Sequence, residues 1–123
     1  MTSILLVDDD QQFRSMLTEV LTDAGYQVQQ ASNGVQALKL YASLPTDLVI
    51  TDLVMPEKEG LEMIQEFKQL YAEARIIAVS GGMRGGAQNY LKMAKALGAH
   101  RVLAKPFSHR EILEAVSEVL NQE

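Results

Sequence analysis

Short apolar runs alternate along the chain with longer segments whose apolar residues recur at helical spacing. Ile4–Val7 and Leu48–Thr51 are too short for a typical helix, and they are apolar on both faces, as in strands buried in a parallel sheet. Tyr26–Ala31 alternates as a less buried strand does. The pattern predicts five strands: Ile4–Val7, Tyr26–Ala31, Leu48–Thr51, Arg75–Val79 and Arg101–Ala104.

The segments between these runs predict helices. The clearest helix precedes Gly25, which is placed to cap its C-terminus, and its apolar face comprises Phe13, Met16, Leu17, Val20, Leu21 and Ala24. Asn33 can cap a second helix that runs through Tyr41, and Pro45 ends that unit.

Three further helices follow. The third spans about 59–71, with its inner side marked by Leu61, Ile64, Phe67 or Lys68, and Leu70. The fourth covers 87–97 and ends at Gly98. The last begins at Ser108, whose spacing to Glu111 matches a capping box, and its apolar stripe is formed by Ile112, Ala115, Val116 and Val119. Five strands alternating with five helices predict an α/β fold with right-handed crossovers and a doubly wound parallel sheet.

The amino-acid composition restricts the class of protein to which the chain can belong. With 123 residues, 47% of them hydrophobic, we expect one domain that spans residues 1–123. The net charge of −5 disfavours direct nucleic-acid binding, which normally needs a basic patch. The absence of cysteine excludes disulfides and thiolate chemistry and agrees with the cytoplasm. No signal peptide or membrane span is visible, so we expect no membrane association.

Polar residues follow four of the predicted strands where each strand ends. Asp8, Asp9 and Asp10 follow the first strand, and Asp52 follows the third; Ser80 closes the fourth and Lys105 the fifth. Because the carboxyl ends of parallel strands lie on one edge of a sheet, where open α/β sheets bind ligands, these groups should converge. A carboxylate cluster repels itself without a cation, and all-oxygen ligands favour Mg²⁺. Phosphate chemistry is the leading hypothesis.

Each residue alone also has an ordinary explanation. The acidic triplet can be a solvated turn, with Asp10 as the N-cap of the first helix. Asp52 and Ser80 can be turn residues, and Lys105 can be a surface lysine. Independent turn residues, however, are not expected to fall together at the ends of four strands. The glycines at 81, 82, 85 and 86 suit a plain flexible loop or a mobile switch beside this edge, and they match no phosphate-binding glycine motif.

The sequence resembles a response regulator receiver domain of two-component signalling over essentially its whole length. The resemblance rests on Leu5–Asp10, on Asp52–Pro56 with Gly60 following, on Val79–Gly81 and on Lys105–Phe107. It implies a flavodoxin-like (βα)5 fold with strand order 2-1-3-4-5. It also implies a cytoplasmic phosphoprotein rather than an enzyme, a domain that promotes its own phosphorylation and slow dephosphorylation. No output domain is expected in this chain.

The resemblance implies the following roles. Asp52 accepts a phosphoryl group from a phosphohistidine of a sensor histidine kinase or a histidine phosphotransfer protein, in a phosphorelay. Mg²⁺ is held by Asp9 and Asp52, by Asp8 through water, and by the main-chain carbonyl of Val54. Lys105 pairs with a phosphoryl oxygen. Ser80 hydrogen-bonds another phosphoryl oxygen and acts as the switch residue. Its movement biases a protein surface that binds an unidentified downstream protein.

Several positions depart from the family's pattern. Val102 stands where a switching aromatic is common, so coupling must run through the Ser80 to Ala87 loop or through small-residue packing. Val54 and Gly82 cannot orient water, which predicts slow dephosphorylation.

His100 and Arg101 replace acidic residues that the transcription-factor branch uses in dimer contacts, so that dimer is not expected. We interpret His100 and His109 as surface residues.

Two other functions remain as alternatives. A degenerate receiver would act as an unphosphorylated docking module, and the missing aromatic at position 102 is its main support. A Mg²⁺-dependent phosphohydrolase also uses a strand-end aspartate, but it typically needs a second acid two residues later, where this chain has Val54.

Overall fold

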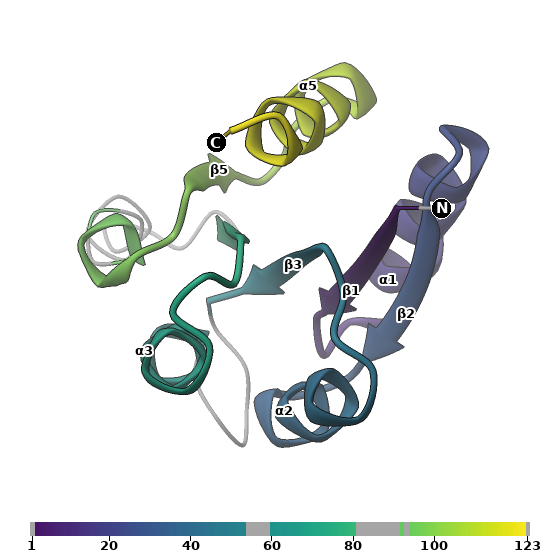
Figure 1. Cartoon of the computed structure of the whole chain (residues 1–123). Coiled ribbons are helices and arrows are strands. Elements are labelled where there is room, and N and C mark those ends of the chain that lie inside the picture. The colour runs from purple at the N-terminus through teal and green to yellow at the C-terminus, as the bar shows by residue number, and fades with distance from the viewer. Residues whose placement is uncertain (1, 54–59, 81–91, 93, 123) are drawn as a thin grey trace.

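Five parallel strands form one sheet in the computed structural model of the protein, which describes residues 2–53, 60–80, 92 and 94–122 (Figure 1). The strand order is β2-β1-β3-β4-β5. The elements are β1 Ser3–Val7, α1 Gln11–Asp23, β2 Gln27–Ala31, α2 Gly34–Ser43, β3 Leu48–Asp52, α3 Gly60–Leu70, β4 Ile76–Ser80, β5 Arg101–Ala104 and α5 His109–Leu120. The flavodoxin-like α/β fold and its strand order are thus confirmed. Residues 94–97 are helical, whereas 87–91 of the predicted fourth helix lie outside the described residues.

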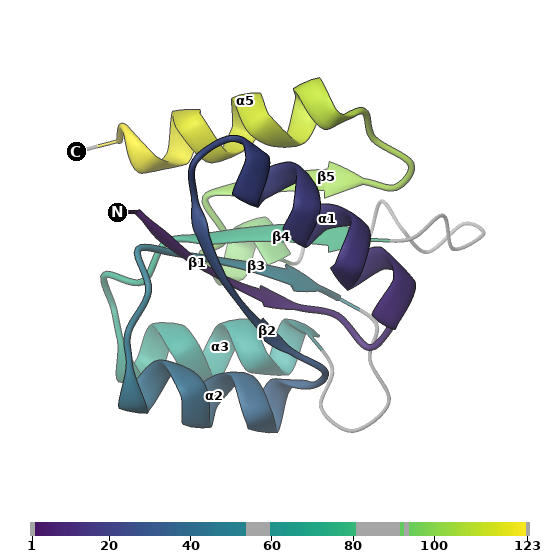
Figure 2. The same ribbon diagram turned by 90° about the vertical axis from the view of Figure 1, so that its right-hand side faces the viewer.

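Helices cover both faces of the sheet (Figure 2). Alternate residues of a strand point to opposite faces, so Ile4 and Leu6 pack with α1 and α5 while Leu5 and Val7 pack with α2 and α3. All four side chains are fully buried. This two-sided burial explains why the strands are continuous apolar runs in the sequence.

Side-chain caps fix where three helices begin. Asp10 accepts hydrogen bonds from the backbone of α1, Asn33 caps α2, and Ser108 forms a complete capping box with Glu111 at α5. These caps satisfy backbone N–H groups that have no partner within the helix. Gly25, with φ of +99°, makes the turn after α1 in a conformation that other residues rarely adopt. The helix starts predicted at Asp10, Asn33 and Ser108 are confirmed, while those predicted at about residues 59 and 87 lie outside the described residues.

Three residues predicted on inner helix faces are exposed. Met16 is 39% exposed and Leu70 is 66% exposed. Ala24 is the C-cap of α1 and also lies at the surface. Among the described side chains of α3, those of Met63, Ile64 and Phe67 are buried, and α3 ends at Leu70. The next residue, Tyr71, packs against the core in place of Leu70. The side chain of Leu61, also predicted on the inner face, lies outside the described residues.

No helix within the described part of the chain is long and apolar enough to cross a membrane.

Candidate functional site

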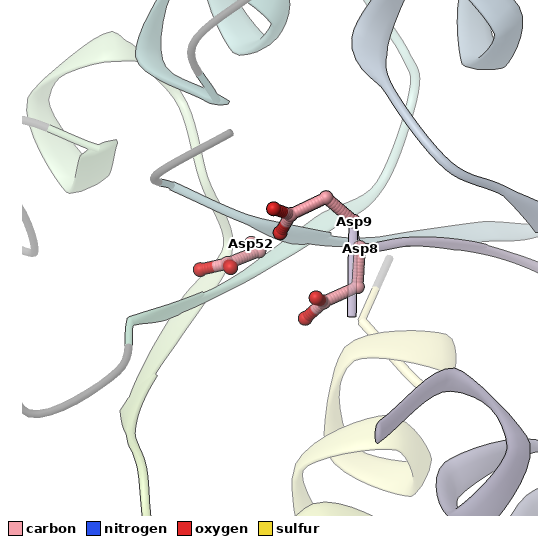
Figure 3. A group of neighbouring side chains, drawn as sticks. All are labelled: Asp8, Asp9 and Asp52. Carbon is pink, nitrogen blue, oxygen red and sulfur yellow. The ribbon is translucent and has the colours of Figure 1, made fainter. Parts of the chain in front are cut away.

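Three aspartates meet at the carboxyl edge of the sheet. Asp8 and Asp9 directly follow β1, and Asp52 is the last residue of the neighbouring strand β3. Carboxylate oxygens of the three residues lie within 4.8 Å of one another, and the side chains extend to the same side of the strand ends (Figure 3). Asp8 and Asp52 are buried, while Asp9 is exposed. The predicted convergence is confirmed for these three residues.

Asp8 is held from several sides. Its carboxylate accepts a 2.9 Å hydrogen bond from the Asp10 N–H through Oδ1, and Oδ2 lies 2.9 Å from Nζ of Lys105. Its main-chain carbonyl accepts from the Arg14 guanidinium, and its N–H donates to Ala31 on β2. Burying a carboxylate that is only 1% exposed is costly without such partners.

Both carboxylate oxygens of Asp52 have polar neighbours. Its Oδ1 accepts from the N–H of Leu53 at 2.8 Å, and its Oδ2 lies 3.7 Å from Nζ of Lys105. The hydroxyl of Thr51 donates to the Asp52 main-chain carbonyl at 2.9 Å. The strand end therefore presents the carboxylate toward the other acids in one orientation.

Lys105 links the fourth and fifth strands to the acids. Its N–H donates to the Ser80 carbonyl at 2.7 Å, which continues the β4–β5 ladder beyond the paired residues Ser80 and Ala104. Its ammonium lies near both Asp8 and Asp52, and it also stands 3.8 Å from the centroid of the Phe13 ring. From the sequence, Phe13 is predicted only on the apolar face of the first helix, and its closeness in sequence to the acidic triplet was the available signal of its contact with Lys105.

Ser80 and Val102, the predicted switch residues, lie on neighbouring strands. Ser80 is fully buried at the end of β4. Val102 is partly buried, pairs with Ala78 and packs on the side of the sheet covered by α2 and α3. Val54 and the 81–87 segment lie outside the described residues. Asp10 acts as the N-cap of α1, as predicted.

The chemistry of this donor set fits a hard divalent cation. Three carboxylates supply oxygen ligands, which Mg²⁺ prefers. Their mutual repulsion is offset in part by the Lys105 ammonium and would be offset further by a cation. The same arrangement favours an electrophile that brings anionic oxygens to Asp52, because positive charge beside the carboxylate stabilises them.

The resolved pKa shifts lie away from this edge. His100, interpreted from sequence as a surface residue, is half-buried, and its Nδ1 accepts from the Ile76 N–H at 3.3 Å. Burial, with Lys68, Arg75 and Lys95 nearby, lowers the pKa of His100. His109 is exposed, as expected.

Tyr41 is the second residue with a resolved shift. Burial raises the pKa of the Tyr41 phenol, and the nearby Tyr71 and Asp47 raise it further. Its ring packs against Phe67 and Tyr71, with centroids 4.9 and 4.8 Å away. This aromatic group belongs to the packing of α2 against α3 and takes no part in the acidic site.

Comparison with known proteins agrees with this geometry. Residues 4–117 match the response regulator receiver domain family. The chain is 39% identical over 119 residues to the chemotaxis protein CheY of Bacillus subtilis, covering 96% of this chain and 97% of that one. It is 37% identical over 117 residues to sporulation initiation phosphotransferase F of the same organism, covering 95% and 92%.

A solved structure shows the same fold. A response regulator receiver domain protein from Clostridium thermocellum superposes with a TM-score of 0.90 at 26% identity, covering 98% of this chain and 95% of that one. The chain belongs to the response regulator receiver domain family and is a receiver domain of two-component systems. Receiver domains interact with histidine kinases or phosphotransfer proteins.

Proposed function

We propose that this receiver domain accepts a phosphoryl group on the Asp52 carboxylate. The proposal rests on the environment of the Asp52 carboxylate. Oxygens of two further carboxylates lie within 4.8 Å of it, and the Lys105 ammonium lies 3.7 Å away. The donor is a phosphohistidine of a sensor histidine kinase or phosphotransfer protein. The domain is a signalling component of the cytoplasm rather than an enzyme that turns over a free substrate.

The phosphoryl transfer is a displacement at the phosphorus atom. A carboxylate oxygen of Asp52 bonds to phosphorus, the bond from phosphorus to the donor's imidazole nitrogen breaks, and the nitrogen keeps the electron pair. The product is an acyl phosphate on Asp52. Oδ1 accepts the Leu53 N–H, and Oδ2 faces Lys105, whose positive charge would stabilise phosphoryl oxygens arriving at this carboxylate.

The residues present fit Mg²⁺, which would neutralise charge on the phosphoryl oxygens when bound. Asp9 and Asp52 would hold it directly, Asp8 through water, and the Val54 carbonyl would complete the protein's ligands. Lys105 then stabilises a phosphoryl oxygen as a compact positive charge. Ser80, one β-ladder position away from Lys105, would donate its hydroxyl to another oxygen and so pass the change to the protein surface.

Labelling by a small phosphodonor tests this function. The protein is incubated with acetyl phosphate and Mg²⁺ and its intact mass is measured, beside Asp52→Asn and a sample with EDTA. We expect one phosphoryl group on the wild type and none in the other two samples. Equal labelling of Asp52→Asn would refute the acceptor assignment, and an unlabelled wild type would favour the docking-module alternative.

The phosphorylated state should be long-lived. Val54 and Gly82 stand two residues after Asp52 and Ser80, and neither side chain can orient an attacking water. We therefore expect slow loss of the label in Mg²⁺ buffer without a phosphatase. A half-life of seconds, measured by quenched intact-mass time points, would contradict this expectation.

A further inference from the structure

The Lys105 ammonium has an aromatic neighbour as well as acidic ones. Its Nζ stands 3.8 Å from the centre of the Phe13 ring, while 2.9 Å separates it from Asp8 and 3.7 Å from Asp52. The face of an aromatic ring carries partial negative charge and attracts a cation at this range. The ammonium therefore lies between two carboxylates and a ring face.

The Phe13 ring is itself held in place. The Phe13 N–H donates to Oδ1 of Asp10, the N-cap of α1, at 3.2 Å. The ring packs edge-to-face on Phe107, with centroids 6.0 Å apart and planes at 85°. Phe107 follows Lys105 by two residues, so the segment that supplies the ammonium also braces the ring that attracts it.

Without the contact to the Phe13 ring, the Lys105 side chain would have space to move. A largely apolar cavity of about 340 Å³ opens beside it, lined by Phe13, Met16, Lys105, Pro106 and Phe107. A lysine side chain is long and flexible, and it loses its position readily. The ion pair with Asp8 alone would also draw the ammonium toward Asp8 and away from a group arriving on Asp52. The ring is uncharged, so it can hold the ammonium without competing for it as a second anion would.

We propose that Phe13 is a positioning residue for phosphoryl transfer: its ring face holds the Lys105 ammonium where it meets the phosphoryl group entering on Asp52. This inference rests on the proposed function. It also assigns the Phe107 ring a supporting part, since the edge contact keeps the Phe13 face turned toward Lys105.

Substitutions that separate ring electronics from ring size test the inference. The rate of labelling by acetyl phosphate is compared among wild type, Phe13→Leu, Phe13→Tyr and proteins with singly, doubly and triply fluorinated phenylalanine at position 13. Fluorine withdraws charge from the ring face and changes its volume little. We expect Phe13→Leu to slow labelling about two- to fivefold, the size of an ordinary cation–π contact. Phe13→Tyr should keep the rate, and each added fluorine should lower it.

The matched control is the same triple fluorination at Phe67, a core ring that packs on Tyr41 and Tyr71 and not on Lys105. It should leave the rate unchanged. Rates that stay flat across the fluorinated series at position 13, or that fall equally at position 67, would overturn the inference and leave the acceptor function standing. A wild type that takes no label would refute the proposed function itself.

An NMR measurement without phosphodonor reports the contact directly. Protons on the Lys105 side chain next to Nζ should resonate upfield of those of the other lysines, because they lie over a ring face. Phe13→Leu should abolish the upfield shift, and a folded Phe13→Leu sample that keeps it would overturn the inference. Thermal unfolding of each variant establishes that folded proteins are compared.

Discussion

Replacing Asp52 with asparagine should stabilise the metal-free protein against unfolding. Asp52 is buried beside two other carboxylates whose oxygens lie within 4.8 Å, and it has a partly compensating ammonium at 3.7 Å. Asparagine removes both repulsions and the attraction to Lys105. Its amide oxygen can still accept the N–H of Leu53 as Oδ1 does now.

The magnitude follows from Coulomb's law. With each repulsion taken at the outer bound of 4.8 Å and the Lys105 attraction at 3.7 Å, the net repulsion is about 2.4 kcal/mol at an effective dielectric of about 20 and about 0.6 kcal/mol at about 80. The site lies at a sheet edge with Asp9 exposed, so the gain in unfolding free energy should fall between these limits. For a domain of this size about 1 kcal/mol corresponds to a rise of about 4 °C in Tm.

Urea unfolding in EDTA at low ionic strength measures the effect. Asp47→Asn is the matched control, because it removes the same charge from a residue that accepts the Ser3 N–H at 2.8 Å, outside the acidic cluster. It should give no gain. Adding Mg²⁺ should narrow the difference between wild type and Asp52→Asn, because a ligand stabilises the form that binds it better.

Two results would refute this reasoning. One is an Asp52→Asn protein that is no more stable than wild type in EDTA, which would mean that the carboxylates do not repel one another appreciably. The other is an equal gain from Asp47→Asn, which would assign the effect to net charge and not to the cluster.

Three further predictions concern the fold. Phe67→Ala should cost about 3–5 kcal/mol of unfolding free energy because Phe67 is fully buried, whereas Leu70→Ala should change it little because Leu70 is 66% exposed; denaturant unfolding compares them. Ser108→Ala removes the capping box of α5 and should cost about 0.5–2 kcal/mol in the same assay. The pKa of His100 is lower in the folded protein than in the unfolded chain, so the unfolded chain takes up the proton first as the pH falls. The free energy of unfolding that the neutral His100 contributes is therefore fully present above pH about 6.5 and is lost as the pH falls through the folded-state pKa. His100→Gln should flatten that loss in a pH series of urea midpoints, and an unchanged slope would contradict the assignment.

Local signals were sufficient to predict most of the fold. The five strands are apolar runs because helices cover both sheet faces, and their predicted bounds agree with the structure to within a residue or so at each end. The caps at Asp10, Asn33 and Ser108 could be predicted because each acts on backbone groups a few residues away. The strand order came from the family resemblance alone, since periodicity carries no information about which strands are neighbours.

The errors occur where tertiary packing decides. Leu70 continues a helical spacing from Phe67, but α3 ends there and Tyr71 takes the inner position. Met16 has the spacing of a core residue on α1, yet it lies beside the open cavity near Phe107. His100 lies between the predicted helix 87–97 and the predicted strand Arg101–Ala104, and the hydrogen bond that it accepts from the Ile76 N–H depends on β5 lying beside β4.

The sequence predicts which strand ends form the site, but it does not predict how the side chains are arranged there. Parallel strands bring their carboxyl ends to one edge, which is why the sequence alone predicts that Asp8, Asp9 and Asp52 lie together. The position of the Lys105 ammonium between Asp8, Asp52 and the Phe13 ring depends on side-chain packing that spacing does not encode.

The most direct test of the account locates the phosphoryl group. The protein labelled by acetyl phosphate in Mg²⁺ is reduced with borohydride, which converts an aspartyl phosphate to homoserine, and the peptides are sequenced by mass spectrometry. We expect homoserine at position 52, with aspartate retained at positions 8 and 9. Homoserine at position 8 or 9, or a labelled protein without homoserine at position 52, would contradict the account.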